Sequence, residues 1–291
     1  MHGSLCHNSG VLYVGRHRKD AWITAYDLDG RALGTQFRFM DEHLLRSAAA
    51  GLSMDGDHRL WVADTPAGKL RAFTLFGKEV ATVGEGGDQG ADEAGCMGTP
   101  VDVVARGADD ELEVWVASGG MRRHALHVLL PESGKFRSLR PEGDPRGRFR
   151  RLRALDVRGD SIFALEGGAQ RMQVFRGLEH HYSLDLSESL PGDAEPVAFA
   201  TLSDSRMVVA FEGPGGGLLL LGAEGQVRGV LAHSGRDVGQ VDHPCAVVVV
   251  NEEELADGGP TRVFCLDLDG ERVQVFNLEG QCYGAFPVLL D

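Results

Sequence analysis

Short apolar segments recur along the whole chain, separated by turns that are rich in Gly and Asp. In the clearest example, a short turn joins residues 60–63 (LWVA) to residues 69–73 (KLRAF). A near copy of this unit, CLDLDGERVQVF, lies close to the C-terminus at residues 265–276. Short apolar runs between turn signals predict β-strands, and a unit that returns at a longer period predicts a repeat architecture.

Six such units can be placed along the chain. The innermost strand of each unit is expected in the first ten residues and in residues 50–54, 100–104, 154–157, 197–200 and 246–250. A four-stranded sheet cannot bury both of its faces alone, whereas six sheets stacked in a ring bury both faces and leave only short edges. The pattern therefore predicts an all-β, six-bladed β-propeller with four antiparallel strands per blade, in a single domain that spans residues 1–291.

Particular motifs resemble the NHL-repeat family. They are WVADT at residues 61–65, QRMQVF at 170–175, ERVQVF at 271–276 and the turn DLDG at 27–30, with Pro100, Pro196 and Pro244 at the starts of inner strands. The resemblance covers the whole chain, although the third and fifth repeats are degenerate. It implies a six-bladed propeller and leaves the function open, because propellers of this shape serve as lyases, RNA readers and scaffolds.

The composition narrows the class of protein. The formal net charge of −14 disfavours binding to nucleic acid and to anionic membranes. The five cysteines include no C-x-x-C pair, which favours reduced, mostly buried thiols over disulfides or a zinc site. The N-terminus lacks a basic segment followed by an apolar one, and no apolar run is long enough to span a bilayer. We therefore expect a soluble cytoplasmic protein that does not insert into membranes.

Enzymes that resemble this shape carry their site on the propeller axis. The gluconolactonase and regucalcin type holds Ca²⁺ with Glu, Asp and two Asn, but the Asn residues here are Asn8, Asn251 and Asn277, and two axial ligands are hard to supply from them. The amidating-lyase type holds zinc with three His at the starts of inner strands. The corresponding positions here are Ala48, Thr99, Arg151, Glu195 and His243. We therefore expect no metal and no cofactor. His124 and His127, on a third strand, are interpreted as solvated or packed.

Propeller topology also sorts the loops onto two faces. The loops between strands two and three share the first face with the loops between blades, and the remaining loops form the second face. Acidic residues gather on the second face, for example at 109–111 and 252–254. The first face carries basic groups, above all the segment RGRFRRLR at residues 146–153, from which Arg151 and Arg153 are expected to point toward the axis. Arginine suits carboxylate or phosphate ligands. These arginines either bind an anionic ligand or acidic partner, or neutralise neighbours such as Glu195 and Asp242.

No motif for a reaction is found, which favours a non-catalytic protein over an enzyme. The leading hypothesis is a scaffold propeller that binds a protein partner through its Arg-rich first face. The candidate partner- or anion-binding residues are Arg122, Arg123, Arg148, Arg150, Arg151, Arg153, Glu195 and His243. Two alternatives stay open: a metal-dependent hydrolase or lyase with a site on the axis, and an RNA-binding propeller. The pattern leaves the partner, the oligomeric state and the closure of the ring open.

Overall fold

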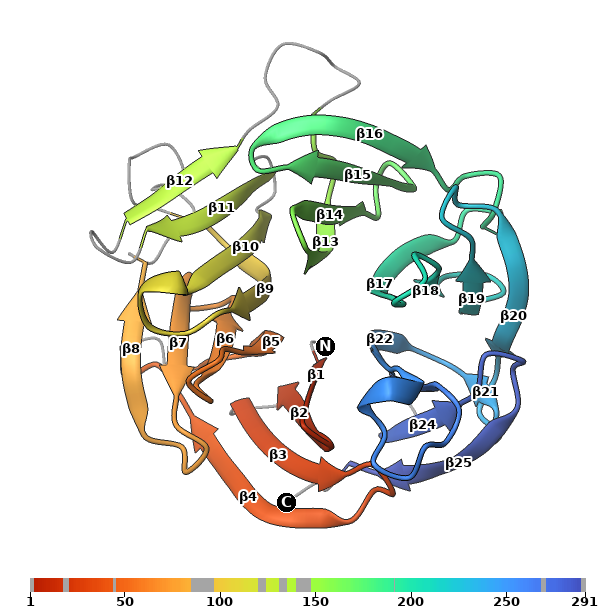
Figure 1. Ribbon diagram of the computed structural model, residues 1–291, viewed down its shortest axis with the longest axis horizontal. Helices are drawn as coiled ribbons and strands as arrows, with labels where there is room; N and C mark the ends of the chain where they lie inside the picture. The colour runs from red at the N-terminus through yellow and green to blue at the C-terminus, as the bar shows by residue number, and fades with distance from the viewer. Residues whose placement is uncertain are drawn as a thin grey trace.

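Six sheets, each built from consecutive strands, stand around a central axis in the computed structural model (Figure 1). The structure describes residues 3–17, 21–43, 46–84, 97–119, 124–130, 135–139, 148–190, 192–267 and 271–288. In every sheet the first strand is innermost and the fourth lies at the rim. The expected six-bladed β-propeller is confirmed.

The first three blades contain twelve strands. They are β1 Gly3–Asn8, β2 Val11–His17, β3 Ala21–Asp27, β4 Ala32–Phe39, β5 Ala49–Met54, β6 Leu60–Asp64, β7 Lys69–Phe73, β8 Glu79–Val83, β9 Pro100–Arg106, β10 Glu113–Gly119, β11 His124–Leu130 and β12 Lys135–Leu139. The inner strand of the first blade does come from the first ten residues, as expected.

The last three blades contain thirteen strands. They are β13 Leu152–Arg158, β14 Ser161–Glu166, β15 Arg171–Arg176, β16 Glu179–Asp185, β17 Glu195–Thr201, β18 Met207–Glu212, β19 Gly217–Leu221, β20 Val227–Ser234, β21 Gln240–Val241, β22 Pro244–Val250, β23 Arg262–Asp267, β24 Arg272–Phe276 and β25 Cys282–Pro287. Blade 5 differs from the expected four strands, because the two-residue strand β21 pairs with β20 in parallel as a fifth.

Side-chain packing closes the ring between blades 6 and 1. The sheet β1–β4 and the sheet β22–β25 share no strand, since each is made from one blade only. An apolar cluster that includes Leu12, Phe264 and Val273 fills the seam between them. Near the rim, the rings of Tyr26 and Phe286 lie with centroids 5.2 Å apart. Buried apolar area therefore holds the first and last blades together, with an ion pair beside it in which Arg262 Nη1 lies 3.8 Å from Asp29 Oδ1.

Each boundary between neighbouring blades contains one buried apolar cluster. Close to the axis the blades are so near that only small residues fit. A Cβ atom added to Gly51 of β5 would lie 2.6 Å from the Cα of Asp102 on β9, the inner strand of the next blade. Glycine is therefore required there by close approach of the two strands.

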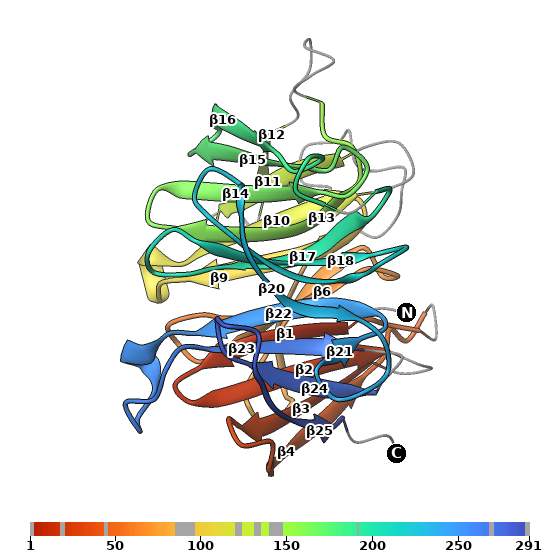
Figure 2. The same cartoon turned by 90° about the vertical axis from the view of Figure 1, so that its right-hand side faces the viewer.

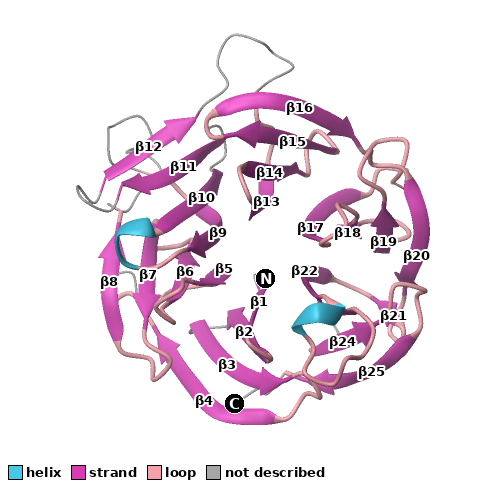
Figure 3. Cartoon of the chain, viewed as in Figure 1, coloured by secondary structure: helices cyan, strands magenta, loops and turns pink. Residues whose placement is uncertain are grey.

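The strands run across the thickness of the ring, so successive loops alternate between its two faces (Figure 2). The short 3-10 turns Asp109–Glu111 and Glu252–Glu254, cyan in Figure 3, both lie in loops between first and second strands. They belong to the second face and consist of acidic residues only, as expected. Within the described part of the chain, no helix is long and apolar enough to cross a membrane.

The described cysteines Cys6, Cys245, Cys265 and Cys282 are free thiols. Cys6 and Cys265 are buried, and the other two are partly buried. Burial raises the pKa of the Cys6 thiol to about 12. Such thiols stay protonated near neutral pH and are poor nucleophiles.

Candidate functional site

The inner strands of five blades carry a β-bulge at the same position. In each, one residue is left out of the pairing with the second strand, and these residues are Ala50, Val101, Arg153, Val197 and Cys245. All five line a cavity of about 450 Å³ that opens on the axis at the first face. A bulge re-aims the side chain of its extra residue. Four of the five blades use this device to present a small or apolar group, and blade 4 presents an arginine.

The cavity has two unlike walls. On the side of blades 1 to 3 it is lined by Gly3, Ala50, Val101 and Gly119, together with His124. On the side of blades 4 to 6 it is lined by Arg151, Arg153, Glu212 and His243, together with Leu152, Val197, Pro244 and Cys245. A ligand in this cavity would meet small apolar groups and one histidine on the first side, and the arginines and the glutamate on the second.

The charged wall is a chain of groups of alternating sign. Arg151 Nη1 lies 2.6 Å from Glu195 Oε1, and Arg153 Nη2 lies 3.0 Å from Glu195 Oε2. The same Nη2 atom lies 2.8 Å from Glu212 Oε1. The other oxygen of Glu212 is 3.8 Å from His243 Nε2, which is too far for a hydrogen bond. The chain joins blades 4, 5 and 6, so the expected neutralisation of Arg151 and Arg153 by Glu195 is confirmed. Asp242 instead pairs with Arg236.

Arg151 has an unusual backbone conformation. Its φ of 59° lies in the left-handed region, which non-glycine residues seldom adopt. The residues at the matching position, two before the bulge in each of the other bulged strands, do not share it: Ala48, Thr99, Glu195 and His243. The carbonyl of Arg151 accepts a hydrogen bond from Gly167 N at 3.0 Å, which holds the segment in place. Local strain of this kind clusters at binding and active sites.

A buried carboxylate fixes the loop that leads to Arg151. Glu166, at the end of β14, is fully buried and accepts a hydrogen bond from the backbone N–H of Arg150. It also pairs with Arg171 at 2.7 Å and with the side-chain amide of Gln173 at 2.8 Å. The loop that carries Arg151 is therefore anchored to a buried network of charge-assisted hydrogen bonds.

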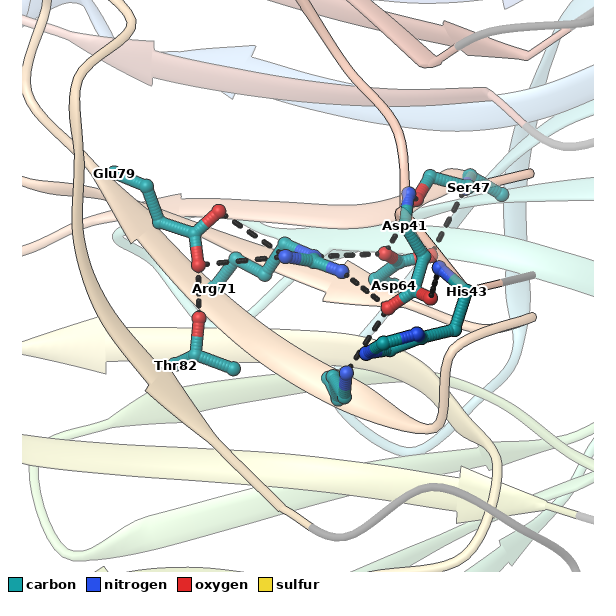
Figure 4. A network of polar contacts seen from close by, with 9 residues as sticks. Asp41, His43, Ser47, Asp64, Arg71, Glu79 and Thr82 are labelled. Atoms are coloured by element: carbon teal, nitrogen blue, oxygen red, sulfur yellow. Dashed lines mark hydrogen bonds and ion pairs between the residues drawn. The ribbon is translucent and has the colours of Figure 1, made fainter. Parts of the chain in front are cut away.

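Blades 2 and 6 use the same device. Asp64 is fully buried, receives the backbone N–H of Ala48 at 3.1 Å and pairs with Arg71 at 2.9 Å (Figure 4). Asp267 receives the backbone N–H of His243 at 3.0 Å and pairs with Arg272 at 3.2 Å. Asp64 and Asp267 therefore have structural roles in their blades.

Blade 5 departs from this device. Glu212 ends β18 at the position that Asp64, Glu166 and Asp267 hold in their blades. The residues after it are Gly213, Pro214 and three more glycines, so blade 5 has no arginine at the position that Arg171 and Arg272 hold in blades 4 and 6. Its side chain is 28% exposed and faces Arg153 and His243 of the neighbouring blades. Loss of the repeat pattern thus turned a structural carboxylate toward the axial cavity.

His124 also lines the cavity, where it is partly buried. Its Nδ1 accepts a hydrogen bond from the backbone N–H of Leu152 at 3.3 Å. Burial lowers the pKa of His124, and nearby Glu166 opposes this only in part. The neutral ring then carries its proton on Nε2. Alignment of the repeats could have located His124, because it pairs with Gly119 at the position where Arg171 pairs with Glu166 in blade 4.

The other predicted residues take different places. Arg122 and Arg123 lie outside the described residues. The side chains of Arg148 and Arg150 are exposed, and these residues support the site through their backbones, since the Arg148 carbonyl accepts from Arg171 at 2.7 Å. The structure thus brings Arg151, Arg153, Glu195 and His243 together. Their role in binding stays a prediction.

The described residues contain no group of three or more His, Cys, Asp or Glu side chains arranged to hold a metal ion. The interpretation of His127 as a packed residue is confirmed. It is fully buried between the hydroxyls of Ser118 and Ser138, each 2.7 Å from a ring nitrogen.

No protein-family model and no curated protein sequence matches the chain. Solved structures with a similar fold do match. A virginiamycin B lyase from Staphylococcus aureus has a TM-score of 0.61 at 11% identity, over 99% of this chain and 84% of the lyase. A chain in a nidogen–laminin complex has a TM-score of 0.64 at 12% identity, over 96% of this chain and 94% of that one. A gluconolactonase from Xanthomonas campestris has a TM-score of 0.56 at 12% identity, over 97% of this chain and 83% of the enzyme. At such identities the likeness shows the propeller fold alone.

Proposed function

We propose that this chain is a non-catalytic binding module that docks a protein partner on its first face, over the mouth of the axial cavity. The observation that carries the proposal is the state of Arg151. Its side chain is 54% exposed, and within the described residues its guanidinium bonds to Glu195 through Nη1 only. An arginine that is held rigidly, half exposed and incompletely paired is suited to an acidic group on a partner.

The surroundings of Arg151 support this proposal. Its left-handed backbone is fixed by Gly167 and, through Arg150, by the buried Glu166. Because its backbone is already fixed, Arg151 has less conformational entropy to lose when a partner binds. Among the structures of this fold, the nidogen–laminin complex is an assembly of two proteins, whereas the virginiamycin B lyase and the gluconolactonase are enzymes. The fold therefore accommodates both classes, and the exposed, incompletely paired Arg151 supports the binding class.

A comparison of capture by three forms of the full chain tests the proposal. The site form carries Arg151→Glu with Arg153→Glu. The control form carries Arg31→Glu with Arg176→Glu, two exposed arginines with the same change in charge. We expect the wild type and the control to retain a stoichiometric partner, identified by mass spectrometry, and the site form to lose it. The single variant Arg151→Ala repeats the test at an exposed position if the double variant folds poorly.

Equal capture by all forms, or the absence of a stoichiometric partner of the wild type, would contradict a binding role for this face. A metal ion that purifies with the wild type in stoichiometric amount would favour the axial hydrolase or lyase instead. Steeply salt-dependent binding of RNA would favour the RNA-binding alternative.

A further inference from the structure

We infer that the axial cavity binds a carboxylate carried on a small apolar body. The carboxylate would bind to Arg151, and the body would pack against the wall formed by Gly3, Ala50 and Val101. The inference deepens the proposed function and rests on it where the carboxylate belongs to a protein partner.

The positive end of the charged wall is Arg151. Both oxygens of Glu195 are already bonded, Oε1 to Arg151 and Oε2 to Arg153. Arg153 in turn is shared between Glu195 and Glu212 through one nitrogen. The charge of Arg153 is therefore offset by two carboxylates, while Arg151 has only one oxygen of one carboxylate. The remaining N–H groups of Arg151 form a fork that fits a planar carboxylate.

A second donor stands beside Arg151. Its chain neighbour Leu152 donates its backbone N–H to His124 Nδ1, which leaves the proton of the neutral ring on Nε2. The depressed pKa of His124, caused by burial, keeps this ring neutral near pH 7. Arg151 and His124 both line the cavity, so each can donate to a ligand bound there.

The acidic members of the wall limit the charge of the ligand. Glu195 and Glu212 lie within one ion-pair distance of the arginines, so a group with two negative charges would be repelled by them. The two arginines of the wall already offset its two glutamates, so a ligand with one negative charge adds less repulsion than a ligand with two. This arrangement favours a carboxylate over a phosphate.

The opposite wall sets the shape of the ligand. Gly3, Ala50, Val101 and Gly119 carry small or no side chains, and none of them has a charge. A volume of about 450 Å³ falls in the lower half of the range for small-molecule sites. The two walls together fit a short apolar group that ends in a carboxylate. Such a group is found at the C-terminus of a peptide and in a free organic acid.

Calorimetric titration of the full chain with matched probes tests the inference. One pair is 3-methylbutanoate and its amide, and a second is a short peptide ending in Ala-Val with a free or an amidated C-terminus. We expect each acid to bind at least about tenfold more tightly than its amide, and more tightly than inorganic phosphate. The peptide pair binding more tightly identifies a chain end as the source, and the free acid binding more tightly identifies a metabolite.

Variants connect the binding to the wall. Arg151→Gln is expected to weaken binding of the acid at least about tenfold, and Val101→Asp to do the same from the apolar side. Arg176→Gln, at an exposed position outside the cavity, is the matched control and should bind as the wild type does.

Equal binding of acid and amide, no binding of either acid, or equal losses in Arg151→Gln and Arg176→Gln would overturn the inference. Capture of a partner that depends on Arg151 but no binding of a carboxylate would leave the proposed function standing and this inference wrong. Binding of the free acid with no captured partner would leave this inference standing and the proposed function wrong.

Discussion

Arg153 donates a hydrogen bond to Glu212 across the boundary between blades 4 and 5, with Nη2 2.8 Å from Oε1. Glu195 shares the same nitrogen at 3.0 Å, so one arginine separates two carboxylates. All three side chains are only about a quarter exposed. Arg153 therefore has a structural role. Its effect on stability must be measured separately from any effect on binding.

Replacement of Arg153 by Met is expected to destabilise the fold, because Glu212 then loses its ion pair and Glu195 keeps only its pair with Arg151. Solvent screens these partly exposed groups, so the loss should be about 1–2 kcal/mol. Urea unfolding measures it, with Arg176→Met as the exposed control. A free energy of unfolding equal to that of the wild type would show that solvent alone separates the two carboxylates.

A larger loss is expected at the buried acid of blade 2. Asp64 accepts hydrogen bonds from Ser47 Oγ at 2.7 Å and from the Arg71 guanidinium at 2.9 Å (Figure 4). Asp64→Asn removes the charge and leaves Arg71 with Asp41 and Glu79 as its remaining partners. Because the site is dry, we expect a loss of about 3 kcal/mol in the free energy of unfolding.

The exposed Asp29, whose side chain is 69% accessible, provides the control for this experiment. Asp29→Asn should change the free energy of unfolding by less than about 0.5 kcal/mol. Equal losses in the two variants would mean that the buried position of Asp64 adds nothing to the effect of removing one negative charge.

The blades could be predicted from the sequence because strands two and three carry their own signals. Residues 60–63 and 69–73 are apolar at alternating or consecutive positions, and the turn between them is short. β1 has no such signal, since Gly3–Asn8 contains Ser4, His7 and Asn8. It could be expected only because a ring needs a sixth inner strand. Propagation of one register from blade to blade also located Arg151 and His243 correctly.

The pairing within the site could not be predicted in the same way. Arg153 contacts Glu212 from another blade, 59 residues along the chain, and the repeat does not encode how neighbouring blades are rotated against each other. The role of Glu212 depends on what is missing after it, the arginine that follows Glu166 and Asp267. β21 escaped prediction because two residues are too few for a periodic signal.

Asp102 is expected to make stability depend on pH. It lies on inner strand β9 between Gly51 and Leu155, and its removal from water raises its pKa from 3.8 to about 7. Backbone N–H groups of Leu155 and Val103 oppose this shift, and Asp156 adds to it. A raised pKa in the folded state means that the stabilising contribution is complete below pH 3.8 and is lost as the pH rises toward 7.

The variant Asp102→Asn does not titrate and isolates this contribution. Relative to the variant, the wild type should lose stability between pH 4 and pH 7, by up to about 4 kcal/mol. Chemical unfolding of both proteins at several pH values measures the difference, and Asp160→Asn on the surface serves as the control. A difference between wild type and Asp102→Asn that stays constant over this range would show that Asp102 is ionised throughout.

The seam between blades 6 and 1 is expected to be the place where the ring opens first, because the chain runs from one blade to the next at the other five boundaries and does not cross this one. Phe286 is 8% exposed, contacts the ring of Tyr26 and lies directly against Gly30. Phe286→Ala removes this aromatic contact and leaves a cavity, so the free energy of unfolding should fall by about 3–4 kcal/mol. Hydrogen exchange measured by mass spectrometry should then accelerate in β24, β25 and β3, while blades 3 and 4 keep the protection of the wild type.

Val227→Ala, at an exposed position on the outer strand β20, controls for the loss of an apolar side chain at the rim. It should leave the free energy of unfolding and the rates of hydrogen exchange nearly unchanged. Uniform acceleration over all six blades in Phe286→Ala would show instead that the ring unfolds as one unit and that the seam is no weaker than the other boundaries.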